Sequence, residues 1–325
     1  MIRISIALLS FFLLTAASPD PPPAWAYVTP AVDAKPKTDD GKLRQVPNSS
    51  ATYSFAQVTD RFVAPDWHPA DHPKMPAIVA HGRKPDVFAC GYCHRADGPG
   101  GPENASLAGL PYDYILEQMA DYKSGRRSTA LPQRLPQSFM ISLAKAATDD
   151  EIHAAARYFS SLKPRQNIRV VEASMVPQTR VAGWVLTPHE AEAKSPLTRE
   201  PIGRRIVEMP EDLDRFESRD THATFVAYAP PGSLRAGAAL VRGETLRGEH
   251  SGTPPCATCH GKDHRGHELA PSIAGRSPSY IVRQLYEFQT NARVGKSALL
   301  MRPAAARLTE DDRIAIAAYL ATLKP

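Results

Sequence analysis

Residues 90–94 read CGYCH and residues 256–260 read CATCH, and these two stretches decide how the rest of the chain is interpreted. Together they contain all four cysteines of the 325-residue sequence. In each stretch two cysteines enclose two other residues, and a histidine follows directly. Four cysteines in an exported chain would usually indicate disulfides, but their confinement to two short clusters argues against that pairing.

The pattern C-x-x-C-H is the attachment motif for c-type haem. Two thiols on one turn can form thioethers with both vinyl groups of a haem, and the next residue brings its imidazole beneath the iron. A zinc or thiol-redox site is the alternative for a single copy, but two copies that use every cysteine favour haem. We therefore predict two covalently attached haem c groups, held by Cys90, Cys93 and His94 and by Cys256, Cys259 and His260.

An internal repeat relates the two parts of the chain that carry these motifs. When the sequence is shifted so that Cys90 falls on Cys256, the triplet LAG at 107–109 superposes on IAG at 273–275. The helices predicted downstream of each motif also correspond. Three further pairs of identical residues match in this register, namely Tyr114 with Tyr280, Gln118 with Gln284, and Arg127 with Arg293.

The repeat also indicates the sixth ligand of each iron. In each part a methionine, Met140 or Met301, stands eight residues before the threonine that begins the last predicted helix. Met119 is a rival in the first part, but its counterpart is Leu285, and a position that accepts leucine indicates core packing. The predicted iron ligands are therefore His94 with Met140, and His260 with Met301.

Ligation by histidine and methionine has a chemical consequence. The soft thioether favours ferrous iron and raises the reduction potential relative to a site with two histidines. It also closes the iron to substrate. Such a site suits outer-sphere electron transfer and does not suit peroxide or oxygen chemistry, which needs an open coordination position.

Helical periodicity and caps predict a mainly α fold in two repeated domains with a different segment between them. Thr148 followed by Glu151 has the form of a capping box, and Thr309 can cap its helix in the same way. Middle helices are expected at 112–122 and 278–290. We use four names for the predicted segments, which are the N-terminal extension (27–75), the first half (76–164), the insert (165–235) and the second half (236–325).

The insert has a different character from the two halves. Short runs of β-branched residues near 169–171, 180–186, 204–208 and 224–228 predict short strands, with a hairpin or small sheet. The charged segment 209–220 is expected to be a solvated surface. The insert is interpreted first as a structured linker, and alternatively as a docking surface for a partner or a clamp that fixes the distance between the haems.

Two groups of polar residues are candidates for further functional sites. Trp67, His68, His72 and His81 gather near the end of the N-terminal extension, but with no matching acidic or thiolate ligand they are expected to be ordinary surface residues rather than a second metal site. Arg127 and Arg293 are placed to pair with haem propionates. Tyr114 and Tyr280 are expected to pack on the haem or to bond a propionate.

The first residues predict export. Residues 4–17 are apolar and follow Arg3, a length that suits a signal peptide better than a membrane span. Cleavage after Ala26 would give a signal peptide of residues 1–26, and an earlier cleavage near Ser18 is the alternative. No other stretch is long enough for a transmembrane segment, so the mature chain is expected in the periplasm. A formal net charge of +5 without a basic run gives no indication of nucleic-acid binding.

With these motifs placed, the chain resembles the bacterial tandem di-haem cytochromes c, which are built from two class I cytochrome c domains. The resemblance covers about 84–164 and 236–325, and the N-terminal extension and insert depart from the compact tandem form. It implies electron carriage between redox partners such as a periplasmic dehydrogenase, a terminal oxidase or reductase, or a quinol-oxidising complex.

The predicted function is thus that of an electron-transfer protein and not of an enzyme. The first alternative is the cytochrome subunit of a periplasmic dehydrogenase, with the insert as the docking surface. A di-haem peroxidase is a weaker alternative, because methionine on both irons would block peroxide. A haem-free redox or zinc module is the remaining one.

Overall fold

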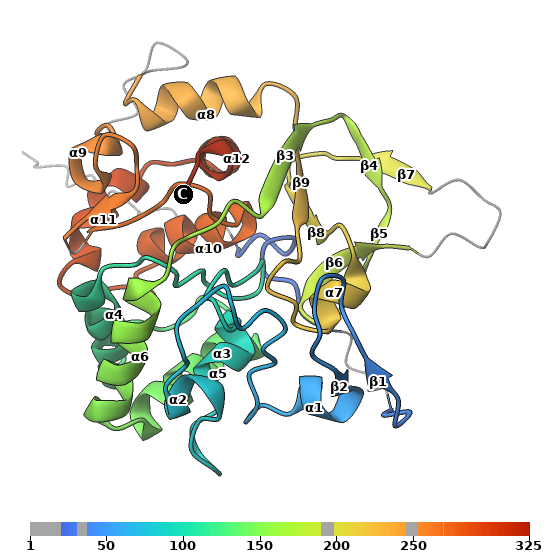
Figure 1. The fold of residues 1–325 in the computed structure, drawn as a ribbon. Helices are drawn as coiled ribbons and strands as arrows, with labels where there is room; N and C mark the ends of the chain where they lie inside the picture. Colours follow the sequence, from blue (N-terminus) through green and yellow to red (C-terminus); the bar gives the residue numbers. More distant parts are fainter. Residues whose placement is uncertain (1–20, 31–37, 190–197, 245–252, 269) are drawn as a thin grey trace, which may run out of the picture.

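The computed structural model describes residues 21–30, 38–189, 198–244, 253–268 and 270–325. The apolar segment predicted as the core of a signal peptide, 4–17, lies outside these ranges. Helices predominate and the strands are short, as the sequence predicts. The helices of the two halves form two groups, one above the other in Figure 1, and the strands lie beside both groups.

The first half is a group of helices around an apolar core. Thr148 and Glu151 form the predicted capping box, in which the threonine side chain accepts from the Glu151 amide and the glutamate side chain accepts from the Thr148 amide. Ile115 and Phe159 belong to the buried cluster that joins the middle and last helices. The helices are α2 (Ala77–Ala80), α3 (Cys90–His94), α4 (Tyr112–Ser124), α5 (Leu135–Ala146) and α6 (Asp149–Ser161).

The second half repeats this arrangement, and its first and last helices approach each other closely. Its last helix is capped by Thr309 with Asp312. A Cβ atom on Gly237 would lie 2.0 Å from the carbonyl oxygen of Ala315, so only glycine allows the first and last helices to approach this closely. The elements are α8 (Ser233–Val241), α9 (Ala257–His260), β10 (Gly266–His267), β11 (Ala270–Pro271), α10 (Pro278–Gln289), α11 (Ala298–Ala305) and α12 (Glu310–Thr322).

The insert forms the predicted short strands. The central strand β9 pairs in parallel with β3 and antiparallel with β8, while β5 and β6 form a hairpin and β4 pairs with β7. The expectation that 209–220 is a solvated surface is correct only for its middle, where Glu211, Asp212 and Asp214 are exposed, because Met209 and Asp220 at its two ends are buried. The elements are β3 (Ile168–Glu172), β4 (Met175–Pro177), β5 (Thr179–Ala182), β6 (Val185–Pro188), β7 (Arg199–Pro201), β8 (Val207–Pro210), α7 (Leu213–Glu217) and β9 (Phe225–Ala229).

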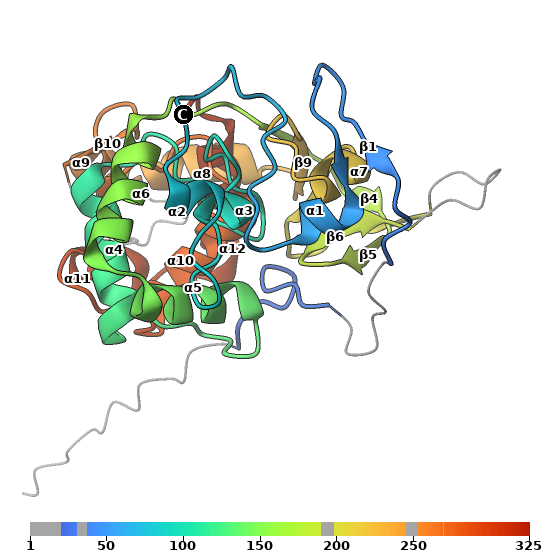
Figure 2. The same cartoon turned by 60° about the horizontal axis from the view of Figure 1, so that its bottom comes forward.

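The N-terminal extension packs against the insert, as Figure 2 also shows from another side. It contains β1 (Leu43–Arg44), β2 (Tyr53–Ser54) and α1 (Phe55–Thr59). The expectation that His68 is an ordinary surface residue is wrong, because His68 is buried together with its neighbour Trp67. Trp67 is 1% exposed and its indole nitrogen donates to the carbonyl of Ser218, 2.7 Å away. The insert covers these residues, and sequence proximity alone could not show this.

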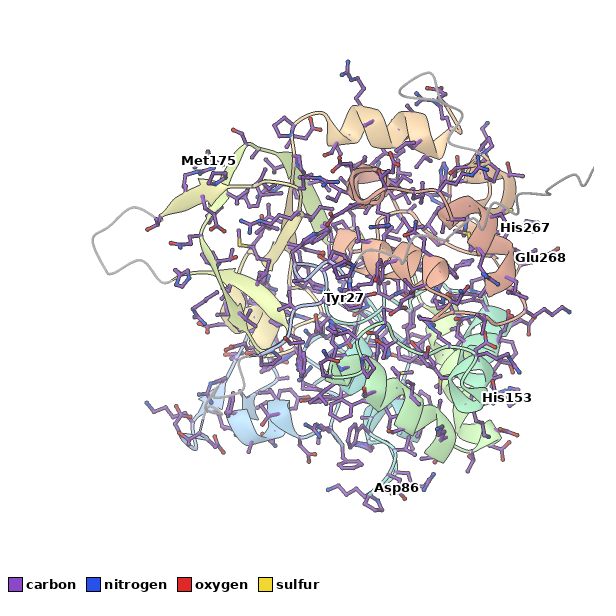
Figure 3. The ribbon with its side chains drawn as sticks, turned by 180° about the vertical axis from the view of Figure 1, so that it is seen from behind. Tyr27, Asp86, His153, Met175, His267 and Glu268 are labelled. Atoms are coloured by element: carbon purple, nitrogen blue, oxygen red, sulfur yellow. The ribbon has the colours of Figure 1, made fainter. Side chains whose placement is uncertain are left out.

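A short stretch near the beginning of the described chain lies between the two halves. Ala26 and Tyr27 are buried, and the Tyr27 ring packs edge-on against Tyr286. One guanidinium nitrogen of Arg283 donates to the Ala26 carbonyl at 2.7 Å. Figure 3 places Tyr27 between the two groups of helices. In the ranges that the structure describes, none of the helices is long and apolar enough to cross a membrane.

Candidate haem sites

The two C-x-x-C-H motifs adopt the same local structure. Each forms a single helical turn, α3 or α9, which brings both cysteines and the histidine close together. Nδ1 of His94 donates to the carbonyl of Ala105, and Nδ1 of His260 donates to the carbonyl of Pro271, both at 2.8 Å. Ala105 and Pro271 match in the sequence repeat. The bond fixes the tautomer and orientation of each ring and leaves Nε2 as the nitrogen available to a metal.

Both histidines are suited to act as neutral ligands. Burial lowers the pKa of His94, and the hydrogen bond to the Ala105 carbonyl only partly opposes this effect. Burial likewise lowers the pKa of His260. An imidazole must be unprotonated to donate its lone pair to iron, and these surroundings favour that form at neutral pH.

In the first half, His94 and Met140 line the same cavity. Met140 comes from α5, a different helix from α3, which carries His94. The walls between them are largely apolar, and they include Leu110, Ile115 and Met119. Met119 and Met140 both line this cavity, so the choice of Met140 as the ligand still rests on the repeat, in which leucine stands at the position that matches Met119. An apolar cavity with an imidazole and a thioether among its lining groups fits a porphyrin with iron at its centre.

The same cavity has a polar end, where Arg127 and Arg134 line it. The Nε atoms of both guanidiniums are buried and have no hydrogen-bond partner among the described residues. Burial, together with the nearby charge of Arg283, lowers the pKa of Arg134 to about 9. Buried donors that lack acceptors indicate an anionic group at this end. The two propionates of a haem supply such a group, so the cavity passes this test of fit.

The sequence repeat predicts arginines near the haem but not how the structure uses them between the halves. Gln118 accepts through one oxygen from Arg127 at 2.9 Å and from Arg293 at 2.8 Å. Gln284 accepts through one oxygen from Arg293 at 2.9 Å and from Arg127 at 3.0 Å. Arg127 and Arg293 also form an antiparallel β-bridge. The four side chains are buried, and each arginine therefore joins the two halves through an approximate two-fold relation.

We call these four residues the Arg-Gln cluster. Their signal in the sequence is that all four positions repeat and that the residues are identical in both halves. Periodicity within one half cannot show that matched residues meet each other, because that contact depends on how the two halves pack. Tyr280 lies beside the cluster, where its hydroxyl oxygen accepts from Arg127 at 3.4 Å.

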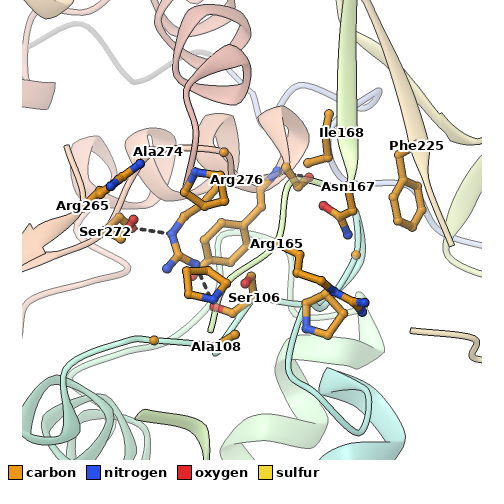
Figure 4. A pocket seen from close by; sticks show the side chains of 18 of the residues that line it. Ser106, Ala108, Arg165, Asn167, Ile168, Phe225, Arg265, Ser272, Ala274 and Arg276 are labelled. Carbon is orange, nitrogen blue, oxygen red and sulfur yellow. Dashed lines mark hydrogen bonds between the residues drawn. The ribbon is translucent and has the colours of Figure 1, made fainter. Parts of the chain in front are cut away.

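A second connection between the halves runs through Arg276. This guanidinium donates to the carbonyl of Ser272 in its own half and, at 2.7 Å, to the carbonyl of Ser106 in the first half, as Figure 4 shows. It lines a cavity of about 260 Å³ between the two halves and the insert. Ser106 directly follows Ala105, which holds the ring of His94, so the second half fixes part of the first histidine's support.

In the second half, Met301 lies in α11 and is partly buried. Met301 and Cys256 pack against the same apolar cluster, and Met301 also packs against Phe288. Burial raises the pKa of Cys256 to about 11 and that of Cys90 to about 12, so both are neutral thiols in apolar surroundings. None of the four cysteines forms a disulfide, so all four sulfur atoms are available for thioether bonds to haem.

Comparisons with known proteins agree with this geometry. The family model for cytochrome c matches residues 242–324. The thiosulfate dehydrogenase electron acceptor of Thiomonas intermedia is 26% identical over 73% of this chain and 79% of its own length. Cytochrome c4 of Azotobacter vinelandii is 33% identical over 38% of this chain and 64% of its length. Cytochrome c-554(547) of Halothiobacillus neapolitanus is 31% identical over 25% of this chain and 99% of its length.

A buried histidine after each cysteine pair, together with buried unsatisfied guanidiniums on the wall of the first cavity, is typical of a protein with covalently bound haem. The comparisons make the assignment specific, and the chain belongs to the cytochrome c family. It carries two covalently attached haem c groups and transfers electrons between redox partners.

Proposed function

We propose that each iron is capped on both faces, by an imidazole and by a thioether, and that the protein is a dedicated electron carrier without catalytic activity of its own. The observation that carries this proposal is the pair His94 and Met140 on the walls of one apolar cavity. When bound, haem supplies a one-electron couple at its iron. The proposed attachment and ligand residues are Cys90, Cys93, His94 and Met140 for one haem, and Cys256, Cys259, His260 and Met301 for the other.

The protein residues have defined roles in this proposal. The carbonyls of Ala105 and Pro271 orient the two imidazoles. Arg127 and Arg134 hold propionates through their unpaired Nε atoms. The apolar walls exclude water, so little solvent must reorganise when an electron arrives or leaves.

We also propose that the two halves are class I cytochrome c domains in tandem, at 76–164 and 236–325. The matched histidine bonds, the matched capping boxes and the Arg-Gln cluster support this division. The insert is then a clamp rather than a passive linker. Glu208 of β8 accepts from Ser277 at 2.8 Å at the beginning of α10, while Arg219 donates to the carbonyl of Tyr92 at 3.0 Å inside the first haem motif.

The proposal is tested on the exported protein with both haems attached. We expect a mass increase equal to two haems, a reduced absorption spectrum of a c-type cytochrome, and rapid electron exchange with small redox mediators. We expect no steady turnover of hydrogen peroxide when an electron donor is present. Sustained peroxide reduction would mean that one iron has an open position and that the protein is a peroxidase.

A second candidate function uses the same chemistry in a stable complex. The relative from Thiomonas intermedia is named as an electron acceptor of thiosulfate dehydrogenase, so this chain would be the cytochrome subunit of a dehydrogenase. Affinity purification from cells separates the two. A free carrier loses its partners in high salt, whereas a subunit retains its dehydrogenase.

We further propose a periplasmic location after cleavage near Ser18. The structure supports the earlier cleavage, because Ala26 and Tyr27 are buried and Arg283 donates to the Ala26 carbonyl. Cleavage after Ala26 would remove that acceptor and leave a new charged amino group at Tyr27. Mass spectrometry of the periplasmic protein should give a mature chain that begins before residue 23, and a chain that begins at Tyr27 would contradict this.

A further inference from the structure

A cluster of potential metal ligands lies outside the two haem sites, where the N-terminal extension meets the insert. His68, Asp220 and His222 each offer one donor atom, and these atoms lie within 4.8 Å of one another. Nε2 of His68 is 3.0 Å from Oδ1 of Asp220. The imidazole rings of His68 and His222 are stacked, with their centres 3.7 Å apart. We propose that these three residues form a binding site for a divalent transition-metal ion of the zinc type.

The choice of donors decides the class of ion. Two imidazole nitrogens and one carboxylate oxygen suit zinc and its neighbours, whereas calcium and magnesium prefer oxygen ligands only. Asp71 stands next to the group, because its Oδ2 atom is 2.6 Å from Nε2 of His222. It can serve as a fourth ligand, which would complete the usual tetrahedral number.

The charges around the site favour a cation. Asp220 is fully buried, and its second oxygen, Oδ2, accepts from Nε of Arg215 at 2.6 Å. That bond orients the carboxylate so that Oδ1 faces His68. Arg165 contacts both Asp71 and Asp97. Three carboxylates thus face two guanidiniums, and the balance is negative before any ion binds.

The ligands are held from both sides by contacts between the two segments. Trp67, the neighbour of His68, donates to Ser218 at 2.7 Å. Arg219, the neighbour of Asp220, donates to the carbonyl of Val58 at 3.0 Å. Supports of this kind around metal ligands restrict their movement and strengthen binding. They also place the site close to the first haem motif, which Arg219 contacts at Tyr92.

One ring must turn for the ion to bind. A tetrahedral zinc ion holds nitrogen and oxygen ligands about 2.0–2.2 Å away, and so about 3.3 Å from one another. His68 and Asp220 already meet this spacing. Parallel rings cannot both direct their lone pairs at one ion, and His222 is the ring that can rotate, since 31% of its side chain is exposed. The same exposure gives the ion an entry path.

The neighbouring histidine His72 is not part of the site. Its Nε2 bonds Asp66 at 3.1 Å, and its Nδ1 lies 2.9 Å from the carbonyl of Pro73. A bound metal ion would cross-link the N-terminal extension to the insert, beside the first haem. This inference does not depend on the electron-carrier proposal, because none of the ligands is a haem ligand.

The test uses the full protein with both haems, after treatment with a chelator. Equilibrium dialysis against zinc, followed by elemental analysis, should show one zinc ion per chain that is lost or weakened at least about tenfold in His222→Ala. The matched control is His189→Ala, which removes an exposed histidine from the same insert. It should bind zinc as the unchanged protein does.

A second variant and a second readout guard against misfolding. Asp220→Asn keeps the shape of the side chain and removes the ligand charge, and it should weaken zinc binding while both haems stay attached. Zinc should raise Tm of the unchanged protein by a few degrees and leave Tm of His222→Ala unchanged. If the unchanged protein takes up no zinc, or if the variants bind it as tightly, the cluster is a set of histidine–carboxylate bonds only and the proposal is wrong.

Discussion

Arg95 in the first half and Gly261 in the second half occupy the same position, directly after the histidine of each haem motif. Both have left-handed backbone, with φ of 69° and 79°. Glycine adopts this conformation without cost, whereas arginine there is strained by roughly 1–2 kcal/mol. The second half has the residue that the backbone prefers. The first half tolerates strain at this position, and the contacts of Arg95 explain why an arginine is found there.

The surroundings of Arg95 supply the answer. It is 2% exposed, lies 3.4 Å from Glu103, and packs on the ring of Phe216 from the insert, with its guanidinium carbon 5.1 Å from the ring centre. The first motif is thus enclosed by the insert, while Cys259 of the second motif is exposed. The two copies of the haem motif therefore lie in different electrostatic environments. We expect the first haem to have the higher potential, since a buried cation and low solvent access both disfavour ferric iron.

The largest expected effect is the fall in reduction potential when a methionine ligand is lost, and it should be equal in the two halves. Replacing Met140 or Met301 with alanine removes the proposed thioether ligand, so each change should lower one potential by on the order of 100 mV and leave the other nearly unchanged. Each should also remove half of the weak sulfur-to-iron band near roughly 695 nm of the oxidised protein. Spectroelectrochemical titration measures both quantities. Retention of the full band in either variant would mean that another group ligates that iron.

The Arg-Gln cluster should respond to changes on either of its two sides. Arg127→Ala and Arg293→Ala each remove two bonds to buried glutamine oxygens, and each should lower the free energy of unfolding by about 2–4 kcal/mol. Chemical denaturation of the protein with both haems measures this. The control is Arg242→Ala, which breaks an exposed ion pair with Glu244 and should cost less than about 1 kcal/mol. Equal losses in all three variants would contradict the assigned role.

A change at residue 95 should alter the potential of the first haem and leave that of the second haem unchanged. Arg95→Gly introduces the residue of the second motif and leaves Glu103 without its cation, so the first potential should fall by on the order of 60 mV, a tenfold change for a one-electron couple. Glu103→Gln should shift the same potential upward, because it removes the negative charge. The second haem serves as the internal control in both titrations. An unchanged first potential in both variants would show that Arg95 is only a packing residue.

The smallest expected effect is the loss of stability when the N-terminal cap of the last helix in either half is removed. Thr148→Ala and Thr309→Ala each remove a side-chain acceptor that caps the helix. Each should lower the free energy of unfolding by about 1 kcal/mol. Calorimetry on the two variants should give similar decreases in Tm. A much larger decrease in one of them would show that its threonine has a role beyond the cap.

Local signals in the sequence predicted the parts of the protein that depend on neighbouring residues. The spacing of Cys90, Cys93 and His94 predicts one helical turn, and Thr148 with Glu151 predicts a helix start, because both depend on contacts within a few residues. The burial of His68 was not predictable in this way. Its partner Asp220 comes from another segment, and the charged sequence around Asp220 suggested solvent instead.

The repeat predicted the pairing of the two proposed methionine ligands, but it did not predict the contact between Arg127 and Arg293. The spacing to the last helix paired Met140 with Met301, because each stands eight residues before the threonine that begins that helix, although the register of the haem motifs does not superpose them. That register aligned Arg127 with Arg293 but could not show that they meet, since the register of a repeat contains no information on how the copies pack.

The Arg-Gln cluster affects how cooperatively the protein unfolds. Duplicated modules on one polypeptide can melt one after the other when little is buried between them. Here, separating the copies would break the bonds that cross between them, from Arg127 to Gln284 and from Arg293 to Gln118, and would expose side chains that are now buried, while the insert still contacts both copies. Heating should therefore give one cooperative transition whose calorimetric and van't Hoff enthalpies agree, and neither copy should persist as a folded fragment after the other has melted.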